Sequence, residues 1–388
     1  MTNAYTDWYK LNKLPFRLRP DPDFLHLAGD TGHVFEALKA AVASGQGVIA
    51  LLGESGVGKT TLLHAIARDR HGSMIVARVQ QPNLTSQELV DALAEQFRLP
   101  APEGAAPHTS ARLTRFIAEE AGHGRTVLIL VDEAHRCTAA MLKELLTLAG
   151  RQPAPLIVLS GEPELAKSLP VGLLGTLHLP RLRQVQIEAY LDYRLTVAGS
   201  QGRTLFDADT LNEFMRYTGG TPQLINMLAD AAMLLGETHN VQRVGITEIR
   251  DAVQELKWVE FAAREVAARQ TIEAATSGSH RALSLNITPE LEVQQSGRHV
   301  SRMVLKPGRL VVGRAEDAGL RLDSQFVSRQ HCQLITTAQQ TFVEDLGSTN
   351  GILVNGKRRR LHRLLPEDKI VIGDHTLTYF ESTGPGTT

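Results

Sequence analysis

The feature that most constrains this chain is a glycine-rich loop between a short apolar run and an amphipathic stretch. Residues 48–52 have the length of a buried strand, and residues 60–70 have helical spacing. The loop between them, Gly53-Glu-Ser-Gly-Val-Gly-Lys-Thr60, matches the pattern GxxxxGK followed by Ser or Thr. Glycines in such a loop let backbone N–H groups surround phosphate oxygens at the start of a helix. The pattern therefore predicts a strand, a phosphate-binding loop and a helix in this order.

Two side chains of this loop have specific chemistry. Lys59 is placed to reach the β- and γ-phosphates of ATP, and the hydroxyl of Thr60 is placed to take a position on Mg²⁺. We expect the nucleotide to contact Gly53, Glu54, Ser55, Gly56, Val57, Gly58, Lys59, Thr60 and Thr61. The alternative is an ordinary glycine-rich turn between a strand and a helix.

A pair of carboxylates follows the apolar run at residues 126–131. A charge at the tip of a buried strand is costly unless a cation or a water network receives it. We expect Asp132 to hold Mg²⁺ through water, and Glu133 to polarise the attacking water as a general base. Lys59 and Glu133 are therefore the predicted catalytic residues. An Asp-Glu pair in this position can also serve as a helix cap.

The N-terminal part of the chain alternates strand candidates with helical patterns. Residues 1–180 are expected to form a parallel α/β sheet with helices on both faces. The expected strands are 48–52, 74–79, 126–131 and 156–160, and the expected helices are 60–70, 86–97, 110–121 and 138–149. Ser86 is the expected N-cap of the helix that begins there.

The pattern changes twice further along the chain. Residues 181–257 are helical throughout, with Asp209, Thr221 and Thr247 at expected N-caps. The expected helices are 186–197, 209–217, 222–236 and one from 247 that continues through 260–275. Residues 258–285 are assigned to a helical extension and linker. From 286 to 388, short apolar runs separated by Gly, Pro, Asn and Asp turns predict an all-β domain.

Several motifs in the first 257 residues have the order and spacing of one family. They are Trp8-Tyr-Lys-Leu-Asn-Lys-Leu-Pro-Phe16, Pro20-Asp-Pro22, Asp132-Glu-Ala-His-Arg136, Gly161-Glu-Pro-Glu-Leu165, Tyr190-Leu-Asp-Tyr-Arg-Leu195 and Gly219-Gly-Thr-Pro-Gln-Leu-Ile-Asn226. Together they resemble the AAA+ ATPases of general secretion and pilus biogenesis, the ExeA/GspA-like family. The resemblance implies ATP binding and hydrolysis, a helical lid over the nucleotide at residues 181–257, and self-association into a ring.

This chain departs from the family pattern at three places. Members usually carry Arg where this chain has Gln223, a lid position that would sense the γ-phosphate. They usually carry Gln where this chain has Glu162, which leaves Ser160 as the nearest polar candidate to sense the phosphate from the sheet. Residues 168–180, which normally supply an arginine finger to the neighbouring subunit, contain no Arg. Arg181 and Arg183 are possible substitutes, although each also fits an ordinary surface arginine. We therefore expect slow or partner-dependent hydrolysis.

A second set of motifs lies between residues 286 and 388. They are Val312-Gly-Arg314, Val327-Ser-Arg-Gln-His331, Asp345-Leu-Gly-Ser-Thr-Asn-Gly351, Val354-Asn-Gly356 and Leu365-Pro-Glu-Asp-Lys-Ile-Val-Ile-Gly373. They resemble the forkhead-associated (FHA) domain, a β-sandwich that binds phosphothreonine peptides. A phosphothreonine needs charge-assisted donors that remain partly in water. The expected contacts are Arg314, Ser328, Arg329, Thr349 and Asn350, while Gly313 and His331 are expected to shape the loops. The alternative is an FHA fold without binding.

Composition limits the remaining possibilities. The formal net charge is −1, so no overall charge attracts this chain to nucleic acid or to an anionic membrane. Its two cysteines, Cys137 and Cys332, form no CxxC pair, which favours a reducing compartment. No apolar run approaches the roughly 20 residues of a membrane helix, and residues 1–16 lack the apolar segment of a secretory signal. The basic cluster at residues 357–360 is interpreted as a solvated strand end within a hairpin.

These observations predict a cytoplasmic, ring-forming AAA+ ATPase whose FHA domain docks it on a phosphothreonine-containing partner. The expected setting is a secretion or pilus-type assembly, to which the protein would be recruited without a membrane segment of its own. Two alternatives are a nucleotide-gated adaptor with little turnover, and a DNA-associated ATPase of the transposition-regulator type. The near-zero net charge disfavours the second alternative.

Overall fold

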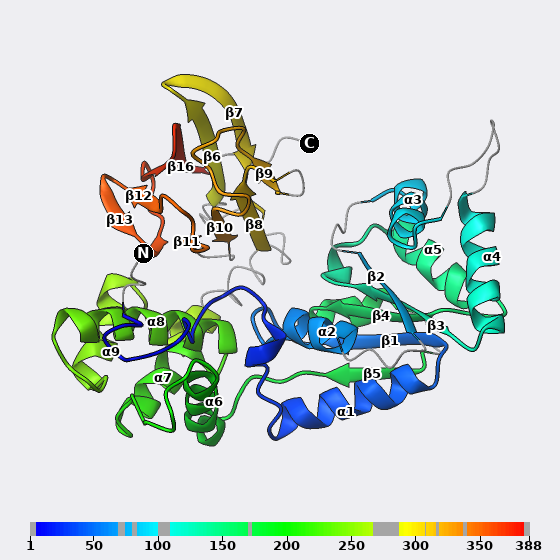
Figure 1. Cartoon of the computed structure of the whole chain (residues 1–388), viewed down its shortest axis with the longest axis horizontal. Coiled ribbons are helices and arrows are strands. Elements are labelled where there is room, and N and C mark those ends of the chain that lie inside the picture. The colour runs from blue at the N-terminus through cyan, green and yellow to red at the C-terminus, as the bar shows by residue number, and fades with distance from the viewer. Residues whose placement is uncertain are drawn as a thin grey trace, which may run out of the picture. The chain divides into compact units, whose positions relative to one another are not determined.

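The computed structural model describes residues 5–68, 74–79, 84–99, 109–169, 173–266, 287–306, 308–315, 318–336 and 340–383. The chain divides into two compact units, Met1–Asp251 and Ala252–Thr388 (Figure 1). Every helix among the described residues is too short or too polar to span a lipid bilayer.

The first unit is built on a five-stranded parallel sheet. Its strands are β1 (Gly47–Leu52), β2 (Met74–Val79), β3 (Thr126–Val131), β4 (Leu156–Gly161) and β5 (Gly175–His178), in the order β2-β3-β4-β1-β5. Leu52 pairs with Gly161 and Val131 with Leu159, so β1, β3 and β4 end at the same edge. The predicted parallel α/β fold is confirmed. The short, half-exposed edge strand β5 was not predicted, because its four residues carry no continuous apolar run.

Helices cover both faces of this sheet, as predicted (Figure 1). They are α1 (Asp30–Ala43), α2 (Lys59–Arg68), α3 (Ser86–Gln96), α4 (Thr109–Gly122) and α5 (Ala139–Ala149). Alternate residues of β1 belong to different cores: Ile49 packs with α1 and α2, and Ala50 with α3, α4 and α5. The N-cap of α3 is Thr85 and not Ser86, because Thr85 forms a capping box with Glu88.

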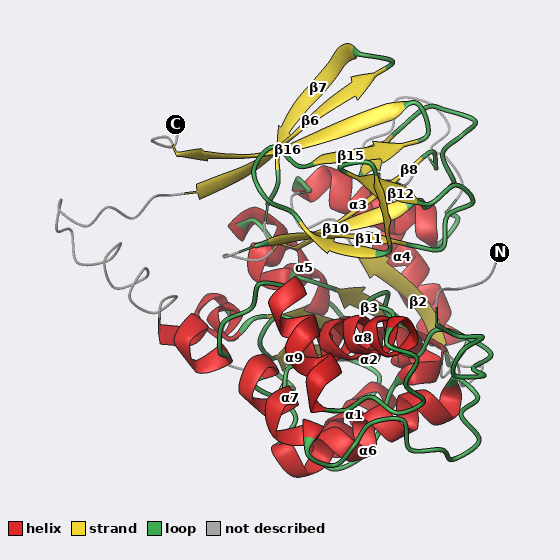
Figure 2. Ribbon diagram, turned by 90° about the vertical axis from the view of Figure 1, so that its left-hand side faces the viewer, coloured by secondary structure: helices red, strands yellow, loops and turns green. Residues whose placement is uncertain are grey.

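The described part of the chain after β5, up to residue 255, forms helices, the last of which crosses the boundary between the two units (Figure 2). They are α6 (Gln184–Val197), α7 (Thr210–Thr218), α8 (Pro222–Thr238) and α9 (Ile246–Glu255). Asp209 and Thr221 are N-cap residues, although neither side chain makes a capping hydrogen bond. Thr247 lies inside the first turn of α9, so its prediction as an N-cap is wrong. The predicted unbroken helix is also wrong, because α9 ends at Glu255 and residues 256–260 are not helical; residues 267–275 lie outside the described part.

The first residues of the chain pack against these helices. The Nε1 of Trp8 donates to the carbonyl of Val241 at 2.9 Å, and the Nε of Arg194 donates to the carbonyl of Pro15 at 2.7 Å. The guanidinium of Arg194, which is buried, also lies over the ring of Phe24 in η1 (Pro22–Phe24). Two motifs that are far apart in the sequence, one around Trp8 and one around Arg194, therefore form one structural contact.

The second unit is a β-sandwich, as predicted (Figure 2). Its strands are β6 (Ile287–Gln295), β7 (Arg298–Val304), β8 (Gly308–Gly313), β9 (Leu320–Arg321), β10 (Cys332–Thr336), β11 (Thr341–Asp345), β12 (Ile352–Val354), β13 (Lys357–Arg359), β14 (Leu361–Arg363), β15 (Lys369–Ile372) and β16 (His375–Thr383). The sheet β14-β11-β10-β8-β9 faces the sheet β13-β12-β15-β16-β6-β7 across one apolar core.

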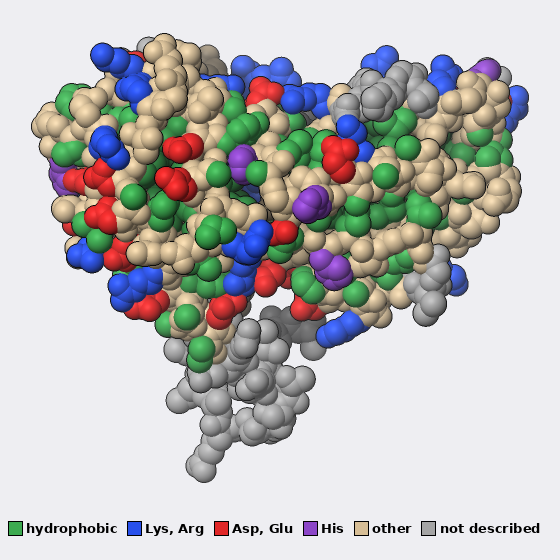
Figure 3. All heavy atoms as spheres, turned by 90° about the horizontal axis from the view of Figure 1, so that it is seen from below, with side chains coloured by type: hydrophobic (Ala, Val, Ile, Leu, Met, Phe, Trp, Pro, Cys, Tyr) green, Lys and Arg blue, Asp and Glu red, His purple; other side chains and the backbone are tan. Residues whose placement is uncertain are grey.

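The basic cluster lies on the predicted hairpin. Strands β12 and β13 pair directly, with Val354 opposite Lys357. Their turn consists of Asn355 and Gly356, with φ of 50° and 76°, which suits a type I′ turn. On the face of the molecule shown in Figure 3, basic and acidic side chains are interspersed.

Candidate functional site

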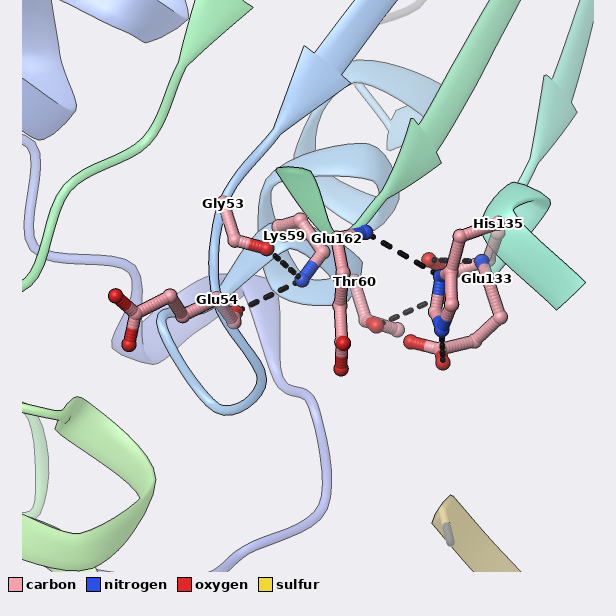
Figure 4. Close-up of polar contacts among 8 residues, drawn as sticks. Gly53, Glu54, Lys59, Thr60, Glu133, His135 and Glu162 are labelled. Atoms are coloured by element: carbon pink, nitrogen blue, oxygen red, sulfur yellow. Dashed lines mark hydrogen bonds and ion pairs between the residues drawn. The ribbon is translucent and has the colours of Figure 1, made fainter. Parts of the chain in front are cut away.

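The phosphate loop joins β1 to the first turn of α2, at the edge where β1, β3 and β4 end (Figure 4). Gly56 and Gly58 have φ of 78° and 107°, which glycine adopts without strain. The side chain of Lys59 is buried, and its Nζ donates to the carbonyls of Gly53 and Glu54, both at 2.8 Å. Burial lowers the pKa of Lys59, and nearby carboxylates, Glu133 foremost, oppose that shift. The phosphate loop thus holds the ammonium group of Lys59 against the loop backbone.

The two predicted metal residues lie together. The hydroxyl of Thr60 donates to Oδ2 of Asp132 at 2.6 Å. Asp132 follows β3 directly, and its N–H donates to the carbonyl of Val79 at the end of β2. Hydroxyl and carboxylate oxygens are the hard ligands that Mg²⁺ prefers, so this pair fits that ion.

Glu133 has an unusual backbone. Its φ of 53° and ψ of 35° place it in the left-handed region, and its N–H donates to Oδ1 of Asp132 at 3.0 Å. Its Oε2 lies 3.7 Å from Nε2 of His135. Burial, followed by the charge of Asp132, raises the pKa of Glu133. Such conformations are concentrated at functional sites.

The end of β4 provides the candidate residues on the sheet side. Ser160 is fully buried on the face that α1 and α2 cover, and within the described residues its hydroxyl has no hydrogen-bond partner. The N–H of Glu162 donates to Nδ1 of His135 at 3.3 Å. The structure therefore brings Ser160 to the same sheet edge as Asp132, while Glu162 contacts the segment after β3.

Gln223 lies against the phosphate loop. Its N–H donates to the carbonyl of Gly56 at 3.1 Å. A Cβ added at Gly56 would lie 2.6 Å from Oε1 and 2.9 Å from Cβ of Gln223. The lid residue that the sequence singled out is thus in contact with the loop.

Both candidate finger arginines have partners in their own chain. Arg181 pairs with the carboxylate of Glu54 in the phosphate loop, with Nε 2.7 Å from Oε2 and a second contact through Nη2. Arg183 lies 3.4 Å from the carboxylate of Asp30 at the start of α1. Arg181 therefore contacts the phosphate loop of its own subunit, whereas Arg183 does not.

The five predicted phosphopeptide residues come from three loops at one end of the sandwich. The N–H of Arg314, just after β8, donates to the carbonyl of Ser328 at 3.1 Å, and the N–H of Thr349 donates to the hydroxyl of Ser328 at 3.1 Å. The amide of Asn350 donates to the carbonyl of Phe326 at 2.9 Å. Arg314, Arg329, Thr349 and Asn350 are exposed and Ser328 is half-buried, so all five lie where an anionic peptide could reach them.

Gly313 and His331 support these loops, as expected. A Cβ at Gly313 would lie 2.2 Å from the carbonyl oxygen of Arg329, so no other residue fits there. His331 is fully buried; its Nδ1 accepts from the N–H of Ser328 at 3.1 Å, which leaves Nε2 to donate to the carbonyl of Gly351 at 3.0 Å. Burial lowers the pKa of His331.

Sequence reasoning missed three contacts near the phosphate loop. The pair of Arg181 with Glu54 joins residues 127 positions apart, so no local pattern indicated it. The contacts of His135 with Glu133 and Glu162 were also missed. The only available indication was that His135 follows Glu133 by two residues at the end of a strand.

Comparisons with known proteins agree with this geometry. A model of the AAA domain matches residues 42–169, and a model of the FHA domain matches residues 310–373. General secretion pathway protein A of Aeromonas hydrophila is 28% identical over 268 residues, which cover 66% of this chain and 49% of that protein. FHA domain-containing protein FhaB of Mycobacterium tuberculosis is 35% identical over 88 residues, which cover 23% of this chain and 53% of FhaB. The chain thus spans about half the length of each of these relatives.

One solved structure comes from a study of phosphothreonine-dependent FHA domain interactions. It is 31% identical, with a TM-score of 0.22, and the match covers 24% of this chain and 95% of that one. The parallel sheet and the matched model show that the first unit contains an AAA domain, a P-loop domain of the nucleotide-binding class. More particularly, this chain combines an AAA domain related to general secretion pathway protein A with a C-terminal FHA domain.

Proposed function

We propose that this chain hydrolyses ATP in its AAA domain and docks on a phosphothreonine-bearing protein through its FHA domain. The observation that carries the first part is the convergence of Lys59, Thr60, Asp132 and Glu133 at one sheet edge. We assign residues 1–180 to the ATPase core, 181–257 to the lid, 258–285 to a connecting extension and 286–388 to the FHA domain.

Each residue of the nucleotide site has a role that its position supports. Phosphate oxygens would replace the loop carbonyls as partners of the Lys59 ammonium, which is already held inside the loop. Thr60 and Asp132 would hold Mg²⁺, which when bound neutralises charge on the phosphates. Glu133, at the end of β3, orients and polarises the attacking water as a general base. Ser160 and Gln223 are proposed to contact the phosphates from the sheet and the lid.

The FHA site supports binding of a phosphothreonine peptide. Arg314 and Arg329 supply guanidinium groups for the phosphate, and Ser328, Thr349 and Asn350 supply hydroxyl and amide donors. By relation to general secretion pathway protein A, we propose that the chain serves a secretion or pilus-type assembly and works as a homo-oligomeric ring, recruited by its phosphorylated partner.

Two observations favour a second candidate, a nucleotide-gated adaptor with little turnover. Arg181 is paired with Glu54 in its own subunit, and Gln223 brings no positive charge to the phosphates. Both arrangements lower the transition-state stabilisation that charged donors give. The intact Glu133 supports hydrolysis.

A pull-down from the native cells tests the docking proposal. Wild-type chain and the Arg314→Ala variant are compared as baits, each with and without phosphatase treatment of the lysate. The proposal expects a partner that only the wild type captures and that phosphatase removes. Capture of that partner by Arg314→Ala as well, or capture by the wild type that phosphatase treatment leaves unchanged, would contradict phosphopeptide docking.

A further inference from the structure

We propose that His135 is a positioning residue that couples the end of β4 to the carboxylate of Glu133. The inference rests on the proposed hydrolysis and assigns a role to a side chain that the nucleotide site itself does not require.

The ring of His135 has one partner on each side. It lies in η2 (Ala134–Arg136), directly after the Asp132-Glu133 pair. Its Nδ1 accepts from the N–H of Glu162 at 3.3 Å, which assigns the ring proton to Nε2. That nitrogen lies 3.7 Å from Oε2 of Glu133. Figure 4 shows the ring between the turn after β4 and the Glu133 carboxylate. A single side chain thus bridges the ends of two strands.

The position of the ring is fixed by its surroundings. A Cβ at Gly161 would lie 3.1 Å from the backbone N and 3.3 Å from Nδ1 of His135, and 2.9 Å from Leu165. A side chain at position 161 would therefore press on Leu165 and on His135. Ala134, the residue before His135, is fully buried in the core on the α5 side of the sheet. The histidine is held between an anchored backbone and a close-packed glycine.

Glu133 needs such a support because its own backbone does little to orient it. Its left-handed conformation takes it out of both β3 and the following η2 turn. Its N–H donates to Oδ1 of Asp132, and its carboxylate lies beside the ring of His135. A general base acts only when held within reach of the water that it activates. Displacement of the Gly161–Glu162 turn would move the ring, and with it the carboxylate.

Turnover and ATP affinity of the full-length chain test this role. His135→Ala should lower kcat by about tenfold or more, while the dissociation constant for ATP changes less than about twofold, because the base acts on the chemical step only. His135→Gln should recover most of the rate, since its amide oxygen can accept from Glu162 and its NH₂ can donate to Glu133. His123→Ala, an exposed histidine at the end of α4, serves as the matched control.

The double variant separates positioning from general damage. In the Glu133→Gln background, His135→Ala should change turnover by less than about twofold, because the residue acts through Glu133. A loss of ATP binding in His135→Ala, or a full further loss in the double variant, would show that His135 only supports the fold and would overturn the inference. Turnover that Glu133→Gln leaves at the wild-type rate would overturn the role of Glu133, and the role of His135 with it. Absence of ATP turnover in the wild type itself would instead overturn the proposed hydrolysis.

Discussion

The hydroxyl of Thr60 donates a 2.6 Å hydrogen bond to Oδ2 of Asp132, which joins the first turn of α2 to the end of β3. The two residues are 72 positions apart, and the parallel sheet brings them together. This hydrogen bond places the two oxygens that are proposed to hold Mg²⁺ side by side. A metal ion would therefore enter a site whose ligands are already aligned.

Thr60→Val should remove the Mg²⁺-dependent part of ATP affinity, since valine has nearly the shape of threonine but no hydroxyl. Thr60→Ser should keep it. Nucleotide titrations with Mg²⁺ and with EDTA measure the difference. An equal effect of EDTA on wild type and Thr60→Val would show that the hydroxyl is no metal ligand.

Lys59→Ala should abolish ATP binding, whereas Glu133→Gln should retain binding and trap an ATP-loaded assembly. Lys59 contacts phosphate in the ground state, while Glu133 acts on the attacking water. Nucleotide affinity, turnover and sedimentation of both variants check this. Unchanged turnover in Glu133→Gln would contradict the assigned role of the carboxylate.

Gln223→Arg should raise basal hydrolysis or tighten ATP relative to ADP. The side chain lies on the phosphate loop beside Gly56, so an arginine there would bring positive charge to the γ-phosphate. One well-placed electrostatic donor is commonly worth roughly 10²–10³ in rate, and a neutral amide gives up part of this. Steady-state turnover of both proteins over a range of concentrations is the measurement. Fast, concentration-independent hydrolysis by the wild type would show that the lid does not need the arginine.

Arg314→Ala should weaken phosphothreonine peptide binding roughly tenfold or more, because a charge-assisted hydrogen bond is worth about 1.5–3 kcal/mol. Arg321→Ala, an exposed arginine in β9, is the control. Peptide titrations with the full chain should also show rejection of the unphosphorylated and phosphoserine forms. Equal binding of the phosphorylated and unphosphorylated forms would mean that this sandwich is a scaffold.

The FHA unit should lose stability as pH falls below about 6.5. Burial depresses the pKa of His331 below its ordinary value of 6.5, so the folded state binds this proton less readily than the unfolded state does. The stabilisation is complete above pH 6.5 and is lost as pH falls toward the folded-state pKa. Thermal unfolding of wild type and His331→Gln between pH 5 and 8 compares the two slopes. Identical slopes would exclude His331 as the titrating group.

The sequence predicted the core of the fold because its strongest patterns are local. The apolar runs that became β1 and β3, and the helices that follow them, are evident without tertiary information. The predictions failed where only a few residues determine the local structure. Thr85, and not Ser86, is the N-cap of α3, because its side chain reaches Glu88. The strand β5 has only four residues and lies at the edge of the sheet.

The candidate site was predictable for a related reason. Lys59, Asp132 and Glu133 follow strands that end at one edge, so the strand order is enough to bring them together. The contacts of His135 with Glu162, and of Arg181 with Glu54, depend on how separate loops meet. No periodic pattern in the sequence indicates these contacts, and they are evident only in the folded structure.

The hydrogen bond from the N–H of Gln223 to the carbonyl of Gly56 has a consequence for the evolution of this protein. It belongs to the main chain, so every residue except proline at position 223 preserves it. The lid can therefore keep its hold on the loop while the side chain at that position varies. Substitutions at position 223 could therefore change the charge beside the phosphate loop during evolution without removing this contact.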